Sequence, residues 1–454
     1  MSDTTEQTDI SESLEAAIDA GDGAALNALL DPLPYNEALR ELLNLSQARR
    51  YAAFDLMPVE LAAELVEEAP YELAAELIEH VAAARAAEIL DEMHSDVQAD
   101  VVREMDDAAA EAVFAEMDAD EAADLRRLVE YDAESAGGLM MSEVFSFPQH
   151  ATVGAVLKRL AGDGEDDFER YRGQHPYMLD DAGRPVGVVS LRLLLTTRRS
   201  VALSEIMIAP MTVSVDTPLD TLENLFDEHP FLGLPVVDEA GILVGVVSRS
   251  AVDEALVKRA ERSHLRQQGV FGDELRSMPL KIRAGRRLGW LSANIVLNIL
   301  AAGVIALYEE TLAAVIALAI FLPMVSDMSG NAGMQAIGVT MRELSLGLVR
   351  PVDALRVWLK ELSVGVINGI ALGILIAIVA WVWKGNGWLG LVVGLALAAN
   401  TVIAVSIGGV APLILKRLGQ DPAVASGPVL TTITDMAGFF LVLSLATLMM
   451  PLLV

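Results

Sequence analysis

Hydrophobic positions divide the chain into three zones with different periodicities. Up to about residue 134, short alanine- and leucine-rich segments recur between acidic residues. From residue 135 to 258, short β-branched runs alternate with polar turns and helical stretches, which indicates strands and helices in alternation. Beyond about residue 286, apolar runs of about 20 residues dominate, long enough for a helix to cross a bilayer. We therefore expect the 454 residues to form several domains, the last of them in a membrane.

The first zone repeats with a period of 12 residues. Five segments fall in step: AAEL at 62–65, AAEL at 74–77, AAEI at 86–89, QADV at 98–101 and AADL at 122–125. This period predicts a helix of about two turns followed by a turn, so that each unit buries its apolar side only against its neighbours. Residues 1–134 are therefore expected to form an all-α superhelical domain with acidic side chains on its outer surface.

Two similar strand–helix units follow, at residues 135–200 and 201–258. Their cores are YMLDDAGRPVGVVS and LPVVDEAGILVGVVS, in which an Asp-x-Ala-Gly turn separates two strands. This pattern predicts a tandem α/β repeat, of which the first unit is the more degenerate. A charged connector over residues 259–285 then leads to a basic cluster just before the first long apolar run: Lys281, Arg283, Arg286 and Arg287.

The last zone, residues 286–454, is expected to be an all-α domain of five membrane-spanning helices. The predicted spans are about 288–308, 312–341, 362–383, 388–415 and 429–453. Lys384 is the only Lys or Arg on the proposed outer side. Because cytoplasmic loops are enriched in Lys and Arg, we expect a multi-pass protein of the inner (plasma) membrane, with cytoplasmic N-terminal domains and the C-terminus outside. The N-terminus also lacks the basic and apolar parts of a secretory signal.

Polar residues occur inside two of these spans. Asp435 lies in the fifth span beside several threonines, and a carboxylate at membrane depth normally faces a partner, water or an ion. In the second span, Asp327, Asn331 and Gln335 lie four residues apart and therefore on one helical face. The same span is expected to be interrupted by Pro323, Gly330 and Gly333. Asp435 could still be a packing residue bonded to neighbouring hydroxyls, but these polar neighbours favour a cation site in a pore.

Charge and composition exclude several classes of protein. The net charge is −32, and residues 1–135 alone hold 35 acidic and 7 basic residues, a net charge of −28. This excludes a uniformly basic nucleic-acid face and favours a cationic partner, although adaptation to a saline habitat would give the same bias. The absence of cysteine excludes disulfides and zinc–thiolate sites. The six histidines are scattered without a metal-ligand or Ser–His–Asp spacing, so we expect no enzyme.

Together, these features resemble the MgtE family of magnesium channels. The resemblance rests on the acidic 12-residue repeat, on YDAESAGGLMMSEV at 131–144 and on the two α/β units, which are similar to tandem CBS domains. It rests also on SGNAGMQA in the second span and on DPAVASGPVLTTITDMAG leading into the fifth. It implies a homodimer with its pore between the two membrane domains, passive influx of Mg²⁺, and cytosolic domains that sense internal magnesium and close the pore.

The same resemblance assigns roles to particular residues. Asp435 would be the carboxylate of the selectivity site, with Asn331, Thr431 and Gly438 lining the path and Asp421 at the cytoplasmic mouth. Gln335 is included because it lies on the face of Asn331. Magnesium would then be both the transported ion and a regulatory ligand, and the connector would be the plug helix that couples the cytosolic domains to the pore.

The sequence departs from this family pattern in two places. CBS domains often bind adenine nucleotides through a Ser or Thr followed three residues later by Asp, but here Leu193 follows Ser190 and Ala251 follows Ser248. Ordinary nucleotide binding by this route is therefore not expected. The connector is basic where relatives carry acids, so magnesium-bridged locking should be weaker, or replaced by salt bridges to acids such as Asp253.

Two other functions stay open at this point. One is a less selective transporter of divalent cations such as cobalt or manganese, because oxygen ligands around a hydrated ion discriminate weakly. The other is a membrane-anchored magnesium or nucleotide sensor that does not conduct.

Overall fold

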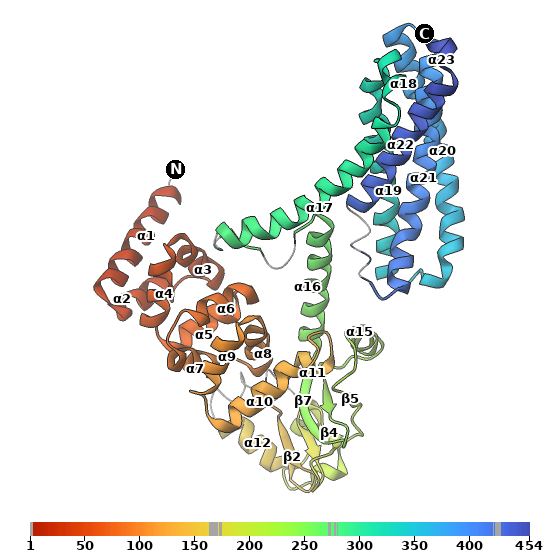
Figure 1. The fold of residues 1–454 in the computed structure, drawn as a ribbon. Coiled ribbons are helices and arrows are strands. Elements are labelled where there is room, and N and C mark those ends of the chain that lie inside the picture. Colours follow the sequence, from red (N-terminus) through yellow and green to blue (C-terminus); the bar gives the residue numbers. More distant parts are fainter. Residues whose placement is uncertain are drawn as a thin grey trace. The chain divides into compact units, whose positions relative to one another are not determined.

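The computed structural model describes residues 3–162, 171, 175–270, 274–276, 278, 280–420, 422 and 428–454. The chain divides into two compact units (Figure 1). One comprises Met1–Ala260 with Leu275–Ser277, and the other comprises Glu261–Glu274 with Met278–Val454. Each unit has hydrophobic cores of its own.

Short helices build the N-terminal part of the first unit. They are α1 (Asp3–Ala20), α2 (Gly23–Leu30), α3 (Tyr35–Asn44), α4 (Gln47–Leu56), α5 (Val59–Glu67), α6 (Tyr71–Glu79), α7 (Ala83–Asp91), α8 (Ser95–Glu104), α9 (Asp107–Phe114) and α10 (Ala119–Glu130). From α5 to α10, each helix begins 12 residues after the one before it. The predicted all-α repeat domain is confirmed.

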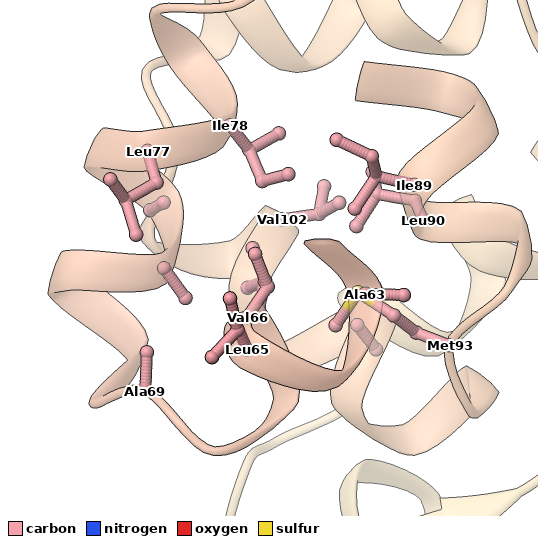
Figure 2. Close-up of a cluster of buried hydrophobic side chains, with 14 of the residues drawn as sticks. Ala63, Leu65, Val66, Ala69, Leu77, Ile78, Ile89, Leu90, Met93 and Val102 are labelled. Carbon is pink, nitrogen blue, oxygen red and sulfur yellow. The ribbon is translucent and has the colours of Figure 1, made fainter. Parts of the chain in front are cut away.

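The apolar side of each repeat is buried against its neighbours. Figure 2 shows side chains of successive helices pointing into a shared interior, among them Leu65, Val66, Ile78, Ile89, Leu90 and Val102. Leu65 and Ile89 have no exposed surface. Full burial of such a side chain stabilises the fold by about 1.5–3 kcal/mol. Helices of nine or ten residues are marginal in water, so this packing between repeats is what stabilises them.

Acidic residues at the helix ends also tie distant repeats together. Glu67, the last residue of α5, accepts a hydrogen bond from the backbone N–H of His94 at 2.9 Å. Glu79, the last residue of α6, accepts one from the N–H of Asp106 at 2.6 Å. His94 and Asp106 are the N-cap residues of α8 and α9, where a carboxylate is favoured by the helix dipole. Part of the acidic surface is therefore structural.

Two small sheets form the α/β part of the first unit. The four-stranded sheet has the order β1-β7-β6-β5, and the three-stranded sheet has the order β2-β3-β4. Their strands are β1 (Met140–Met141), β2 (Ser146–Pro148), β3 (Tyr177–Leu179), β4 (Pro185–Val188), β5 (Val213–Ser214), β6 (Gly233–Val237) and β7 (Leu243–Ser248). In each sheet a parallel pair, β2/β3 or β5/β6, leads into an antiparallel hairpin. This shared topology confirms the tandem repeat.

The described helices of this part are α11 (Ala136–Leu139), α12 (Val153–Gly162), α14 (Leu191–Thr196), α15 (Leu219–Glu228) and α16 (Arg249–Gln267), with a 3₁₀ turn at Leu203–Glu205. Both hairpins close through the same turn. Asp180 accepts hydrogen bonds from the N–H groups of Ala182 and Arg184, and Asp238 does so at the equivalent positions. Gly183 and Gly241 complete the turns with φ of 77° and 78°, a conformation that favours glycine.

In the described part of the second unit, four helices are long and apolar enough to cross a membrane: α17 (Leu280–Ala306), α20 (Ala354–Lys384), α21 (Gly387–Arg417) and α22 (Pro428–Leu448). Helix α19 (Leu318–Ser345) has 28 residues and packs against α21 and α22 (Figure 1). It is about 42 Å long at 1.5 Å per residue, but its polar residues make it less apolar. The short elements are α18 (Glu309–Ala314), a 3₁₀ turn at Pro351–Asp353 and α23 (Met450–Leu453). A helical C-terminal region with several apolar spans is thus confirmed.

The expected interruption of the second span was wrong. Helix α19 is continuous, and the break falls before it, between α18 and Leu318. Pro323 lies in the second turn of α19, where its missing N–H removes a single helical hydrogen bond. A Cβ atom on Gly333 would lie 3.0 Å from the carbonyl oxygen of Ala404, and one on Gly408 would lie 2.3 Å from that of Gly333. These glycines let α19 and α21 approach closely instead of loosening the helix.

Asp91 gives a prediction for the stability of the repeat domain. It ends α7, and burial, together with the charges of Glu121, Glu92 and Asp118, raises the pKa of its carboxyl to about 6. An unfolded Asp has a pKa of about 3.9. The folded state is therefore favoured below pH 4 and loses this advantage as the pH rises through about 6. We expect Asp91→Asn to raise the thermal midpoint of segment 1–260 at pH 8 but not at pH 4, as followed by circular dichroism.

The matched control is Glu116→Gln, which removes one charge from an exposed position of the same domain. It should give a smaller shift that does not follow this pH window. An equal gain for Asp91→Asn at both pH values would contradict the prediction.

Candidate functional site

Asp435 lies on α22 and faces α19. Its Oδ1 accepts a hydrogen bond from the Oγ of Ser326, a residue of α19 that is 7% exposed. The Asp435 side chain is half-buried. Ser326 was not among the residues predicted from the sequence, although it directly precedes Asp327 in a polar stretch of the second span. The carboxylate is therefore held by a neighbouring helix and still reaches the surface of the protomer.

The other polar residues of α19 form an open row. Asp327, Asn331 and Gln335 are all exposed in the single protomer, as the spacing of four predicted. The Nδ2 of Asn331 donates a hydrogen bond to Oδ2 of Asp327 at 3.3 Å. Asp327 directly follows Ser326, whose hydroxyl binds Asp435. The structure thus brings two acids and an amide together at the α19–α22 contact.

The remaining predicted site residues lie at different places. Thr431 is exposed on α22 one turn before Asp435, and its carbonyl accepts a hydrogen bond from the Oγ1 of Thr434 at 2.9 Å. Gly438 is buried, and a Cβ atom there would lie 2.7 Å from the Nδ2 of Asn400 on α21. Gly438 therefore has a packing reason to be glycine. Asp421 lies outside the described residues.

The chemistry of this surface suits a hard cation. Carboxylate, amide and hydroxyl oxygens are the ligands that Mg²⁺ and Ca²⁺ prefer. Among the described residues of one protomer, no group of three or more His, Cys, Asp or Glu side chains is placed to hold a metal ion. One protomer alone therefore offers a partial set of oxygen ligands.

Basic residues of α16 contact the acidic domain directly. The Nζ of Lys258 donates a hydrogen bond to the hydroxyl of Tyr71 on α6 at 2.6 Å and pairs with Glu254 at 2.6 Å. Next to Tyr71, the carboxylate of Asp100 pairs with Arg103. Burial raises the pKa of the Tyr71 hydroxyl and of the Asp100 carboxyl.

Arg259 extends these contacts to the α/β part. It pairs with Asp220 at 2.7 Å and with Glu134 at 3.7 Å. The sequence led us to expect direct salt bridges from these basic residues in place of magnesium bridges. The described pairs are of this kind, with Glu254, Asp220 and Glu134 as partners instead of Asp253.

The two serines of the nucleotide motif serve as helix caps. The Oγ of Ser190 accepts a hydrogen bond from the N–H of Leu193 at 3.3 Å, at the start of α14. The Oγ of Ser248 accepts one from the N–H of Ala251 at 3.0 Å, at the start of α16. Both hydroxyls therefore have a local structural role.

The fold and the site define a multi-pass membrane protein with an acidic helical domain, α/β units of the CBS type and a carboxylate among its spans. Three family models match the chain: the MgtE intracellular N domain at residues 33–134, the CBS domain at 203–258, and MgtE, described as a divalent cation transporter, at 322–445. The magnesium transporter MgtE of Bacillus subtilis (strain 168) is 31% identical over 332 residues, 73% of each chain. The chain belongs to the MgtE family.

Other relatives agree. The magnesium transporter MgtE of Thermus thermophilus is 32% identical over 332 residues, which cover 72% of this chain and 73% of the relative. Among solved structures, the cytosolic domain of the Mg²⁺ channel MgtE in complex with ATP is 30% identical. It covers 54% of this chain and 99% of that one, with a TM-score of 0.48.

The Lys258 cluster gives a prediction about the contact between α6, α8 and α16. Lys258→Met keeps the apolar stem but removes the ammonium that donates to the half-buried Tyr71, whose hydroxyl keeps Asp100 as a partner, so we expect a loss of about 1 kcal/mol. We expect amide hydrogen exchange in residues 71–79 and 95–104 to accelerate in the full chain. Lys158→Met, at an exposed position of α12, removes the same charge and is the control. Equal protection of both segments in the two variants would contradict a role for Lys258 in this contact.

Proposed function

We propose that this protein is a magnesium channel that carries Mg²⁺ passively across the membrane, as a homodimer with its pore between the two membrane regions. The observation that carries the proposal is the exposed polar row of α19 beside Asp435. Exposed polar side chains at membrane depth are tolerated only where they face protein or water. A second copy of the chain, related by two-fold symmetry, would supply both. Relatives named magnesium transporters support the choice of ion.

The pore would select its ion through oxygen ligands. Two copies of Asp435 would place two negative charges around one divalent ion, and Thr431, Asn331 and Gln335 would line the approach. Mg²⁺ dehydrates reluctantly, so these oxygens would hold the ion through its bound waters. Gly438 and Asp421 complete the proposed path, the first through its small size and the second at the cytoplasmic mouth.

Influx needs no source of chemical energy. A membrane potential of 100 mV is worth ~2.3 kcal/mol for each elementary charge, hence ~4.6 kcal/mol for a divalent ion. The driving force points inward if the basic cluster at the start of α17 lies in the cytoplasm, as the positive-inside rule predicts. With that orientation, the acidic domain and the CBS units are cytosolic and the C-terminus is outside.

Closure of the pore would follow from the charge of the acidic domain. A net charge of −28 over residues 1–135 makes its carboxylates repel at low internal magnesium. Ions bound between them at high magnesium would favour a compact arrangement, which shifts the population toward a closed pore. The direct pairs of Lys258 and Arg259 would hold α16 without an ion, so the connector would depend less on magnesium than the acidic domain does.

Less selective transport of divalent ions such as cobalt or manganese is the second candidate. Met328, Met334 and Met436 are exposed beside the polar residues and would add soft sulfur atoms to the surface of the path. Packing between two protomers is the competing role for these flexible side chains.

The central test is the flux of Mg²⁺ into liposomes that contain the purified protein. Asp435→Ala removes the proposed site charge, and we expect uptake to fall about ten-fold or more, because a single charge contact at membrane depth is worth more than ~1.4 kcal/mol. Glu310→Ala, on the short helix α18, is the control and should keep its flux. Undiminished uptake by the Asp435 variant would remove the pore assignment, whereas no uptake by the parent would favour a sensor.

Gating is tested by limited proteolysis of the full chain. We expect millimolar Mg²⁺ to protect the connector and residues 60–130 from cleavage, because bound ions neutralise the repulsion between carboxylates. Sodium at equal ionic strength should protect much less, since it only screens charge. If cleavage rates do not change with magnesium, feedback through the acidic domain does not operate in this protein.

A further inference from the structure

Asn400 is a fully buried polar residue in a nearly aliphatic helix. It lies near the middle of α21 and has no exposed surface. Its Nδ2 donates a hydrogen bond to the backbone carbonyl of Thr434 at 3.0 Å, and Thr434 directly precedes Asp435. Its Oδ1 has no hydrogen-bond partner within the described part of the chain. An amide at membrane depth is more costly than an aliphatic side chain, so its presence points to a specific role.

Gly438 makes room for this amide. A Cβ atom at position 438 would lie 2.7 Å from Nδ2 of Asn400, closer than side-chain carbons approach their neighbours. Gly438 follows Thr434 by four residues, so the two lie one above the other on the same edge of α22. The amide of Asn400 therefore seats against one turn of α22, between the carbonyl of Thr434 and the bare backbone of Gly438.

This contact fixes how α22 is turned. Successive residues of a helix are separated by about 100°, so a helix held at Thr434 and Gly438 has one direction left for Asp435. In the structure that direction leads to Ser326 on α19. A small rotation or slide of α22 would separate the carboxylate from Ser326 and from the polar row of α19.

We propose that Asn400 is a positioning residue that sets the direction of Asp435, and that Gly438 is glycine in order to admit the Asn400 amide. The effect of Asn400 on transport rests on the function proposed above. Its effect on the placement of Asp435 holds whether or not the protein conducts ions. An interhelical hydrogen bond in a membrane averages about 0.6 kcal/mol, so the main effect of Asn400 is on helix placement and not on stability.

Cross-linking measures that placement without reference to transport. The chain contains no cysteine, so Ser326→Cys with Asp435→Cys introduces a single pair in the full-length protein. We expect this pair to form a disulfide under mild oxidation, and its yield to fall several-fold when Asn400→Leu is added. Leucine has the same number of side-chain heavy atoms and the same branch point as asparagine but cannot donate to Thr434, so the helix packs without its anchor. An unchanged yield would overturn the positioning role.

Second-site rescue tests the pairing of the two residues. With the native Ser326 and Asp435, Gly438→Ala should lower Mg²⁺ uptake about ten-fold, because the extra methyl group overpacks the contact. Asn400→Ala opens the space that this methyl needs but also removes the anchor, so Gly438→Ala with Asn400→Ala should transport better than Gly438→Ala alone and no better than Asn400→Ala alone. Failure of this rescue would show that Gly438 serves the ion path independently of Asn400 and would overturn its role in admitting the amide.

A glycine elsewhere in the same region provides the matched control. A Cβ atom on Gly373 of α20 would lie 2.6 Å from the carbonyl oxygen of Gly394, an equally tight helix crossing. Asn400→Ala should not rescue Gly373→Ala. A rescue there would show that Asn400→Ala loosens helix packing in general and has no specific relation to Gly438. If Asp435→Ala keeps its flux while the cross-linking behaves as expected, the positioning role stands and the proposed ion site fails.

Discussion

The membrane region depends on the need to place a carboxylate where lipid cannot solvate it. The carboxylate of Asp435 accepts a hydrogen bond from the hydroxyl of Ser326 on the neighbouring helix α19, and it lies beside the exposed polar residues of that helix. That arrangement requires α19, α21 and α22 to pack closely, which the glycines at their crossings allow. The polar surface that results is incomplete in one protomer. Chemistry and packing therefore lead to the same expectation, that two copies share the path.

The two units of the chain treat charge in opposite ways. In the membrane region a few polar groups are placed individually, each with a partner on another helix. In the acidic domain the carboxylates are numerous, and several have structural roles at helix ends. Lys258 and Arg259 show a third use of charge, because their cations pair directly with carboxylates: Lys258 with Glu254, and Arg259 with Glu134 and Asp220. The proposed transport site, the proposed sensing surface and these fixed cations thus lie in separate parts of the chain.

The sequence predicted the repeat domain and the tandem α/β units well, because both rest on short-range periodicity. The residues it placed at the site divide by helix: Asn331 and Gln335 lie on the exposed face that their spacing indicates, whereas Gly438 faces Asn400. The roles of Ser326 and Asn400 were not predicted, since each depends on which helices pack together. Pro323 and Gly333 led to the wrong prediction of a broken second span. Their local propensity disfavours a helix, but tertiary packing keeps α19 continuous. Periodicity carries no information about which ion is transported, so the expectation of magnesium came only from the resemblance to the MgtE family.

The carboxylates that join α5 to α8 and α6 to α9 have a mechanical consequence. Both act over the same separation of 27 residues, so each ties a helix end to the N-terminus of the third helix after it. These hydrogen bonds limit how far helices three apart in the repeat can separate, and so help to fix the pitch of the superhelix. Asp91 stands at the next equivalent end, where it meets Asp118 and Glu121. The repeat is therefore tied from α5 to α8 and from α6 to α9 and carries charge repulsion from α7 to α10, where neutralising a carboxylate would favour closer approach of the two helices.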